Sequence, residues 1–345
     1  MRKLFFALLL IGVSVLSFIG GRVSRTTDTR VFTLNPTPVP TPLAKYTIET
    51  LKNATIVPGS FQSGELINDT KDITVQTFHM SYDPTLSNGP IKKVSGVINM
   101  PKEGSNLPLV VMLRGFVDQS IYAPGVGTKN GAAFFAENGF ITVSPDFLGY
   151  ASSDSESGNI FETRFQTYTT VLTLLHSIPT PSFSDLTGGR WDGKNIFIWA
   201  HSNGGQVALT TLAVTGESYP TTLWAPVTKP FPYSVLYYTD ESADGGKFIR
   251  KELSKFETLY NTDQYSFTNY LPNIKGPLQF QQGTADDAIP FEWTRSIVNR
   301  LRKNEVEVSY FEYPGADHNM RPSWDEVIAR DIAFFNKWMI VAQEE

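Results

Sequence analysis

Ser202 lies in a sequence pattern that can present a serine hydroxyl on a sharp turn for nucleophilic attack. An apolar run at residues 196–200 precedes it, and Gly204, Gly205 and a helical pattern follow it. The A-x-S-x-G core is a nucleophile elbow with alanine in place of the first glycine. Such a turn needs very small side chains two residues before and after the serine, and alanine is the smallest substitute for glycine. We therefore predict that Ser202 is a nucleophile; the alternative is a serine that only supports a turn.

A nucleophilic serine needs a base, and the base needs an acid that orients it. Asp286 lies 84 residues after Ser202, and His318 lies 32 residues after Asp286. Both follow predicted strands, and the chain order Ser, acid, His is one in which such triads occur. The other three histidines of the chain all precede the acid. We predict a triad of Ser202, Asp286 and His318, with the neighbouring Asp287 as the alternative acid.

The oxyanion of a tetrahedral intermediate requires backbone N–H donors. The residue after the nucleophile, Asn203, is expected to supply one donor. The second donor is expected from the loop RGFV that follows the predicted strand at 109–113. We choose Phe116 because it follows Gly115, at which the chain can turn away. For Arg114 two roles are open, an anchor in an ion pair and a contact to substrate.

Three side chains are candidates for the substrate pocket. Arg114 belongs to the loop just described, and Tyr150 lies in the loop after the predicted strand at 140–143, near the mouth of the site. Trp224 belongs to an aromatic-rich segment at residues 217–275. Aromatic side chains there can line an acyl pocket, and the alternative is packing within the segment itself.

These residues require strands that end beside one another. From residue 46 onward β-rich runs alternate with helical patterns, and the runs at 109–113 and 196–200 are almost entirely apolar, which is typical of central parallel strands. The first two predicted strands are joined without a helix, which predicts an antiparallel start. We predict an α/β fold with a mostly parallel, doubly wound sheet of about eight strands. The predicted strands are 73–79, 94–100, 108–113, 140–143, 195–200, 277–282 and 306–312, and the predicted helices are 131–138, 161–178, 204–214, 291–302 and 323–339.

The segment 217–275 interrupts this alternation. It is rich in Tyr, Thr, Pro and Asp, and it shows one helical pattern near residues 246–259. An insertion of this length is commonly a lid when it is functional. We predict a cap inserted in the domain; the alternative is a solvated excursion without a role.

The composition limits the possible chemistry. The chain has 345 residues, 29 Lys and Arg, 34 Asp and Glu, four His and no Cys, for a net charge of −5. The absence of cysteine excludes disulfides, thiolate metal sites and cysteine nucleophiles. With four His and no basic run, we expect no metal centre, no cofactor and no nucleic-acid partner.

The first 45 residues indicate targeting rather than a folded domain. A short basic start precedes the apolar and small residues 4–21. A helix of that length spans about 24–27 Å against a bilayer core of about 30 Å, so residues 1–21 are either a cleaved signal peptide or an uncleaved anchor. Residues 22–45, with NPTPVPTP, predict an extended Pro/Thr-rich linker. Both alternatives predict export to the extracellular space or cell surface, and an anchor attaches the protein to a membrane through residues 4–21.

Residues 46–341 resemble the α/β-hydrolase superfamily, most closely the catalytic domain of prolyl-oligopeptidase-type serine peptidases and related esterases. The resemblance implies an α/β-hydrolase fold, and in that family the first Asp of the GTADD segment orients the catalytic His, in agreement with Asp286. Two departures matter: the roughly sixty residues at 46–105 leave no room for a β-propeller, and no paired-Glu motif is found. The segments that carry the resemblance are RGF at 114–116, AHSNGG at 200–205, GTADDAIP at 283–290 with EW at 292–293, and YPGADH at 313–318.

The expected activity is that of an exported serine hydrolase that cleaves a small ester or a short peptide through an acyl-enzyme. A carboxylesterase without peptidase activity is the alternative, because both reactions use the same triad. A hypothesis from another class is an inactive surface binding protein that uses the fold as a scaffold.

Overall fold

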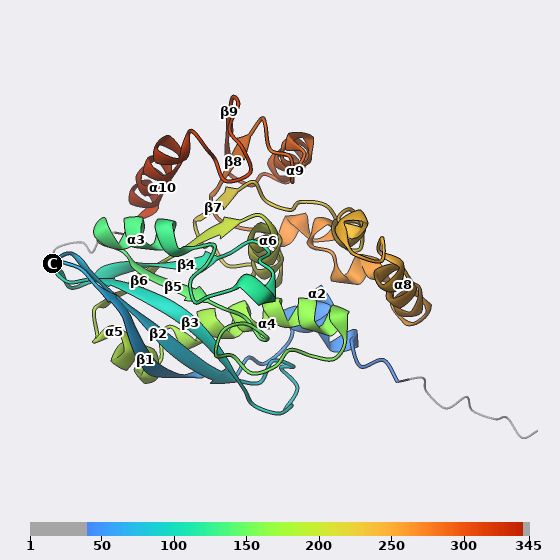
Figure 1. Cartoon of the computed structure of the whole chain (residues 1–345), viewed down its shortest axis with the longest axis horizontal. Coiled ribbons are helices and arrows are strands. Elements are labelled where there is room, and N and C mark those ends of the chain that lie inside the picture. The colour runs from blue at the N-terminus through green and yellow to red at the C-terminus, as the bar shows by residue number, and fades with distance from the viewer. Residues whose placement is uncertain (1–39, 341–345) are drawn as a thin grey trace, which may run out of the picture. The chain divides into compact units, whose positions relative to one another are not determined.

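The computed structural model describes residues 40–340, which fold around one sheet of nine strands (Figure 1). The strand order is β1-β2-β3-β5-β4-β6-β7-β8-β9. The strands are β1 (Ser60–Asp69), β2 (Ile73–Tyr82), β3 (Lys92–Pro101), β4 (Leu107–Leu113), β5 (Ile141–Pro145), β6 (Trp191–His201), β7 (Thr221–Trp224), β8 (Leu278–Gly283) and β9 (Val308–Tyr313). The α-helices are α2 (Ile48–Lys52), α3 (Lys129–Glu137), α4 (Ile160–Ser177), α5 (Pro181–Thr187), α6 (Asn203–Thr215), α7 (Tyr233–Leu236), α8 (Lys247–Leu259), α9 (Phe291–Lys303) and α10 (Trp324–Trp338).

The sheet is antiparallel at one edge and parallel elsewhere. Strands β1, β2, β3 and β5 pair antiparallel in turn, whereas β5, β4, β6, β7, β8 and β9 pair in parallel. The predicted doubly wound, mostly parallel sheet with an antiparallel start is confirmed. The sequence did not reveal β1 because nearly all its side chains are exposed, so it lacks an apolar alternation.

Helices cover both faces of the sheet, and the side chains of strand β4 contact the helices on each face. Successive side chains of a strand point to opposite faces. Val110 and Met112 pack with residues of α3 and α10 in one core, whereas Leu109, Val111 and Leu113 pack with residues of α4, α6 and α9 in the other. Every residue of β4 is buried, as expected of a strand with helices on both sides.

The carboxyl ends of the parallel strands bring distant segments to one edge. The segments predicted to be functional follow these ends directly: residues 114–116 follow β4, 202–203 follow β6, 286 follows β8 and 318 follows β9. Open α/β sheets bind their ligands at this edge. The topology therefore collects at one place residues that are more than 200 positions apart in the chain.

The excursion between β7 and β8 is shorter than the cap predicted at 217–275. Strand β7 (Thr221–Trp224) lies inside that range and pairs with β6 and β8, so the excursion begins after it. With only four residues in a Thr- and Tyr-rich stretch, β7 is too short to show a strand pattern. The excursion packs on α4, where the ring centroid of Phe231 lies 5.7 Å from that of Phe161 and 5.6 Å from that of Phe165.

The folded domain begins a few residues earlier than the sequence predicts. The predicted linker extends to residue 45, yet Leu43 is buried and bonded to the excursion. Its N–H donates to the Tyr260 hydroxyl at 3.1 Å, and the Tyr265 hydroxyl donates to its carbonyl at 3.1 Å. The start of the domain is therefore attached to a segment far along the chain.

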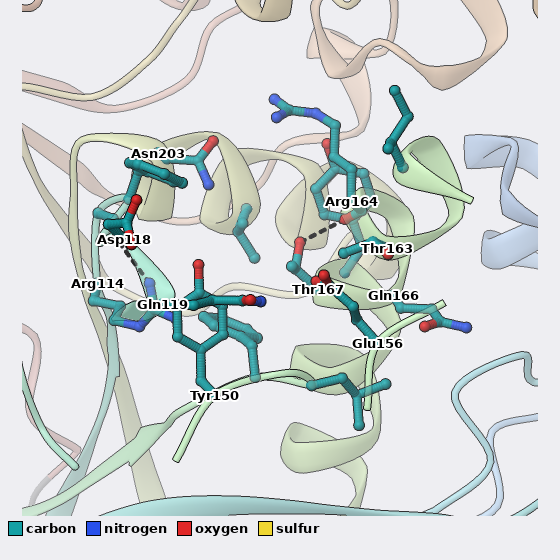
Figure 2. Close-up of a pocket in the computed structure, with 17 residues that line it drawn as sticks. Arg114, Asp118, Gln119, Tyr150, Glu156, Thr163, Arg164, Gln166, Thr167 and Asn203 are labelled. Atoms are coloured by element: carbon teal, nitrogen blue, oxygen red, sulfur yellow. Dashed lines mark hydrogen bonds between the residues drawn. The ribbon is translucent and has the colours of Figure 1, made fainter. Parts of the chain in front are cut away.

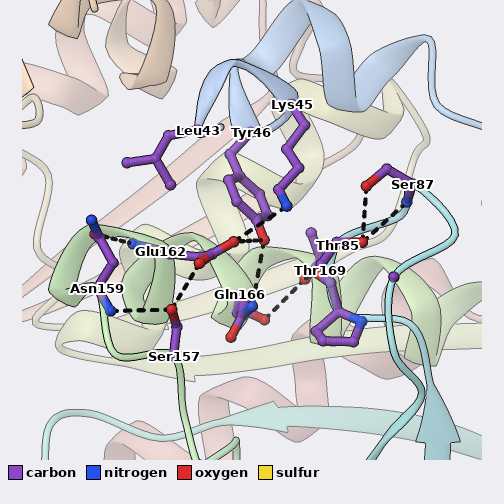
Figure 3. A network of polar contacts seen from close by, with 12 residues as sticks. Leu43, Lys45, Tyr46, Thr85, Ser87, Ser157, Asn159, Glu162, Gln166 and Thr169 are labelled. Carbon is purple, nitrogen blue, oxygen red and sulfur yellow. Dashed lines mark hydrogen bonds and ion pairs between the residues drawn. The ribbon is translucent and has the colours of Figure 1, made fainter. Parts of the chain in front are cut away.

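A polar network continues this attachment to helix α4 (Figure 3). The Glu162 carboxylate accepts hydrogen bonds from the Tyr46 hydroxyl at 2.8 Å and from the Ser157 hydroxyl at 2.7 Å. The Lys45 ammonium lies 3.3 Å from the same carboxylate. Because these partners come from separate segments, the network fixes the N-terminal end of α4 against the start of the domain.

The predicted targeting segment at 1–21 and most of the predicted linker lie outside the described residues. Among helices within residues 40–340, none combines the length and apolar character needed to cross a bilayer.

A buried carboxylate joins α10 to the sheet. Asp331 is fully buried and accepts hydrogen bonds from the Trp224 indole at 2.7 Å, from the Gln279 amide at 3.0 Å, and from Thr222 and Gln281. Burial raises the pKa of Asp331 to about 7. Four donors from β7 and β8 thus hold one side chain of α10 and set the spacing of that helix above both strands.

Core packing at α10 predicts a stability loss when an aromatic side chain is removed. Phe335 is fully buried, and its ring is stacked on Phe197 of β6 with centroids 4.7 Å apart. We expect Phe335→Ala to lower the free energy of unfolding by about 3–5 kcal/mol, measured by urea denaturation. The matched control is Phe248→Ala, whose side chain is 54% exposed and whose change is expected within about 0.5 kcal/mol. Equal losses of stability in the two variants would contradict the placement of Phe335 in the core.

Candidate active site

Ser202 occupies the junction between β6 and α6 in a strained backbone conformation. Its φ of 55° and ψ of −120° lie in a region that non-glycine residues rarely adopt. Its N–H donates to the Trp224 carbonyl at 2.9 Å, and its own carbonyl accepts from the N–H groups of Gly205 and Val227, each at 2.9 Å. These bonds hold the strained turn in place.

The turn depends on glycine where the helix meets the end of β4. A Cβ atom on Gly204 would lie 2.1 Å from the Leu113 carbonyl oxygen and 2.6 Å from the Arg114 carbonyl oxygen. A Cβ atom on Gly205 would lie 2.4 Å from the Cβ of Pro226. Because backbone atoms cannot yield as flexible side chains do, only glycine fits at residue 204.

His318 and Asp286 form a hydrogen-bonded pair beside this turn. The Nδ1 of His318 lies 3.1 Å from one carboxylate oxygen of Asp286 and 3.0 Å from the other. A carboxylate only accepts, so Nδ1 carries the proton and Nε2 is left as a free base. This is the tautomer that a general base for a serine hydroxyl requires.

Several donors hold the Asp286 carboxylate. The backbone N–H groups of Ala288 and Ile289 donate to it at 2.9 and 2.8 Å, and the Gln282 amide donates at 2.9 Å. Burial alone would raise the pKa of Asp286, but the hydrogen bond and charge of His318 together with these donors hold it below the ordinary value. Asp287 is exposed. Of the two neighbouring aspartates, only Asp286 bonds to the histidine.

His201, which directly precedes Ser202 in the chain, contacts His318. The two imidazole rings of His201 and His318 have centroids 4.7 Å apart, and Nε2 of His201 lies 3.0 Å from the carbonyl oxygen of His318. Because a carbonyl only accepts, Nε2 of His201 carries its proton. No hydrogen bond between Ser202 Oγ and His318 Nε2 is present within residues 40–340. Such bonds commonly tighten only when substrate binds.

The predicted oxyanion loop passes directly over Ser202. A Cβ atom on Gly115 would lie 2.9 Å from the Cβ of Ser202 and 3.4 Å from its Oγ. Within the described part of the chain, the N–H groups of Phe116 and Asn203 donate to no protein acceptor. Both predicted donors are therefore available to a negatively charged oxygen at Ser202.

A cavity of about 420 Å³ opens beside these donors (Figure 2). Arg114 and Tyr150, two of the predicted pocket residues, line it together with Phe116 and Asn203. The wall contributed by α4 carries Arg164, which the sequence did not single out; the spacing of the lining residues at 160, 163, 164 and 167 on one helical face is the signal that could have found it. The remaining lining residues are Gly115, Asp118, Gln119, Phe147, Leu148, Glu156, Ile160, Thr163, Gln166, Thr167, Tyr168 and Val207.

Trp224, the third predicted pocket residue, does not line this cavity. It is buried at the end of β7, and its indole N–H is bonded to Asp331 at 2.7 Å. It borders a second cavity of about 520 Å³, together with Trp199, His201 and Trp324. This position follows from strand alternation, which turns Trp224 toward the helices α3 and α10.

Together these residues can do nucleophilic chemistry at a carbonyl. A strained serine, a histidine in the correct tautomer, a buried acid and two free N–H donors meet at one edge of the sheet. Within residues 40–340, His, Asp and Glu side chains form no group of three or more that could hold a metal ion.

The environment of His201 predicts a pH dependence of stability. Burial and the charge of His318 lower the pKa of His201 to about 4, against the opposing effects of Asp286 and Asp317. The unfolded chain, with a pKa of about 6.5, therefore binds the proton first as the pH falls. We expect the free energy of unfolding to lose about 1–2 kcal/mol between pH 7 and pH 5 through this group, and His201→Gln to remove that loss.

Chemical denaturation at the two pH values measures this difference. His176→Gln is the matched control, because His176 is exposed on α4 and its replacement is expected to leave the pH dependence intact. An unchanged pH dependence of stability in His201→Gln would show that His201 does not cause it.

Comparisons with known proteins agree with this fold. The model of the prolyl oligopeptidase family matches residues 183–341. A comparison with curated proteins gave no match. Among solved structures, an acetyl xylan esterase from Paenibacillus is 20% identical, with a TM-score of 0.59 over 83% of this chain and 91% of that chain.

Two further structures show the same fold. Acetyl xylan esterase 1 from Thermoanaerobacterium is 15% identical, with a TM-score of 0.60 over 88% of this chain and 95% of that chain. A puromycin-hydrolysing peptidase from Mycobacterium tuberculosis is 14% identical, with a TM-score of 0.52 over 81% of this chain but only 39% of that chain. The chain thus has the α/β-hydrolase fold, and the match of residues 183–341 to the prolyl oligopeptidase family supports a serine hydrolase, either a peptidase or an esterase.

Proposed function

We propose that the protein hydrolyses carboxylic esters with small acyl groups through an acyl-enzyme on Ser202. The observation that carries this proposal is that strained Ser202 and the Asp286-bound His318 both follow carboxyl ends of the sheet, and that His201, next to Ser202, lies 3.0 Å from the His318 carbonyl. A serine in this setting has a base, an orienting acid and an oxyanion site within one small region.

The reaction follows from the geometry. The Nε2 of His318 takes the proton of Ser202 as Oγ attacks the ester carbonyl, and Asp286 stabilises the imidazolium that forms. The N–H groups of Phe116 and Asn203 bind the developing oxyanion. His318 then protonates the leaving alcohol, and water attacks the acyl-enzyme by the same route in reverse.

Ester hydrolysis is favoured over peptide hydrolysis by the extent of the structural likeness. The chain spans 91% and 95% of the two acetyl xylan esterases but 39% of the puromycin-hydrolysing peptidase. A cavity of about 420 Å³ also suits a small substrate. An acetylated carbohydrate and a simple aryl acetate are therefore the first substrates to examine, and a short peptide is the second candidate, supported by the family match.

We also propose that the protein acts outside the cytoplasm. The basic start and apolar run of residues 1–21 support this location. Mass spectrometry of the protein from fractionated cells should find it in the membrane or exported fraction, with the N-terminus either removed or intact. Recovery of the intact chain from the cytosol would contradict the proposal.

A fluorophosphonate probe tests the mechanism. We expect a covalent adduct on Ser202 in the folded protein, hydrolysis of p-nitrophenyl acetate, and much slower cleavage of aminoacyl and prolyl anilides. Ser202→Ala should lose the adduct and the turnover. Absence of an adduct in folded wild type, or turnover that survives Ser202→Ala, would overturn the proposal.

The neighbouring aspartates provide a matched control for this test. Asp286→Asn is expected to lower kcat by about 10²–10⁴-fold, because the histidine loses the acceptor that fixes its tautomer. Asp287→Asn makes the same chemical change on an exposed residue and is expected to leave kcat within about twofold.

A further inference from the structure

Arg114 is held in an unusual way for a charged side chain. It is 5% exposed, yet no carboxylate within residues 40–340 lies within ion-pair distance of it. Its Nη1 donates to the Gly115 carbonyl at 2.9 Å, and its Nη2 donates to the Asp146 carbonyl at 2.9 Å. The guanidinium therefore bonds to backbone oxygens at the ends of β4 and β5.

Aromatic rings enclose the same guanidinium. Its central carbon lies 4.0 Å from the ring centroid of Tyr150, 4.6 Å from that of Tyr122 and 5.4 Å from that of Phe147. The faces of such rings attract a cation and replace part of its lost hydration. Arg114 and Tyr150 lie close together on one side of the cavity (Figure 2).

The hydrogen bonds reach both sides of Phe116. Arg114 holds the Gly115 carbonyl, and the Tyr150 hydroxyl donates to the Val117 carbonyl at 2.9 Å. The Gly115 carbonyl and the Phe116 N–H belong to one peptide unit, which is planar and trans, so the two groups point in opposite directions. A donor that fixes the carbonyl oxygen on one side therefore fixes the N–H on the other.

We propose that Arg114 is a positioning residue. By holding the Gly115 carbonyl, it aims the Phe116 N–H of the same peptide unit at the oxyanion. The inference rests on the proposed function, in which Phe116 supplies an oxyanion donor. The guanidinium charge also polarises that peptide and strengthens its N–H as a donor. Tyr150 supports the same loop from the Val117 side.

This role differs from both roles that the sequence left open. An ion-pair anchor needs a carboxylate partner, and a substrate contact needs free guanidinium N–H groups toward the cavity. Each Nη instead donates one N–H to a backbone carbonyl, and the Nε, which has no hydrogen-bond partner, is buried. Any effect of Arg114 on the reaction is therefore expected in the transition state, in which the oxyanion forms, rather than in the binding of neutral substrate.

Three substitutions test the proposal in the full-length protein. Arg114→Lys keeps a positive charge but cannot donate from a planar fork, Arg114→Met keeps the apolar stem without charge, and Tyr150→Phe keeps the ring without the hydroxyl. With p-nitrophenyl acetate we expect kcat to fall by about 10–100-fold in the two Arg114 variants and by about 3–10-fold in Tyr150→Phe, with KM within about twofold.

A trifluoromethyl ketone gives the readout that distinguishes positioning from general stability. It adds to an active serine as an anionic hemiketal, so its inhibition constant should rise by the same factor as kcat falls. The matched control is Arg190→Lys: Arg190 also donates to backbone carbonyls, three in its case, at 2.6, 3.0 and 2.8 Å, but at the end of β3 and in the loop before β4. Its kcat is expected to stay within about twofold of wild type.

The outcomes separate this inference from the proposed function. Folded Arg114 variants with wild-type kcat and ketone affinity would overturn it, and a raised KM with unchanged kcat would assign Arg114 to substrate binding instead. If the wild type forms no fluorophosphonate adduct, the proposed function itself fails. If the adduct forms on Ser202 while the Arg114 and Tyr150 variants behave as Arg190→Lys does, only the positioning role fails.

Discussion

The candidate site depends on the close approach of two backbone segments, the first turn of α6 and the end of β4. Gly204 lies so near the Leu113 and Arg114 carbonyls that no side chain fits between them. Gly115 then passes over Ser202, where an added Cβ would lie 2.9 Å from the Ser202 Cβ. Because the contacts at Gly204 are with backbone atoms, the first turn of α6 and the end of β4 cannot shift independently. The strained conformation of Ser202, which costs about 1–3 kcal/mol, is maintained by this packing.

The two sides of the site hold buried charges of opposite sign. On the acid side, Asp286 is a buried anion surrounded by N–H donors from its own loop and by His318. On the oxyanion side, Arg114 is a buried cation surrounded by carbonyl oxygens and aromatic faces. In each case the partners of the charge are mostly dipoles of fixed orientation. Fixed dipoles stabilise charge without the reorganisation that water would undergo, which suits a site where charge develops and disappears.

The sequence predicted most of the sheet, because the central strands are apolar on both faces and are separated by helical patterns. It missed β1, whose side chains are largely exposed, and β7, which has four residues. Ser202 and His318 were predictable because each follows a strand in a short, recognisable segment. The spacing argument favoured Asp286 over Asp287, in agreement with the resemblance, and the structure gives the physical reason, which is the hydrogen bond to Nδ1.

The contacts that no pattern predicts are those made across the fold. Trp224 was placed in the substrate pocket because it is aromatic, whereas its strand register turns it toward Asp331. His201 carried no signal beyond its position next to the serine. The partners of Arg114 come from the two segments that follow β4 and β5, and their encounter depends on the pairing of these strands.

The attachment of Leu43 to the excursion also bears on the order in which the domain can be completed. Leu43 is the first buried side chain of the described residues, and its hydroxyl partners lie 217 and 222 residues later in the chain. During synthesis its backbone groups remain unpaired by these partners until most of the polypeptide has emerged. The N-terminal segment of the domain is therefore one of the last parts to form its contacts, after the strands and helices on which the excursion packs have been synthesised.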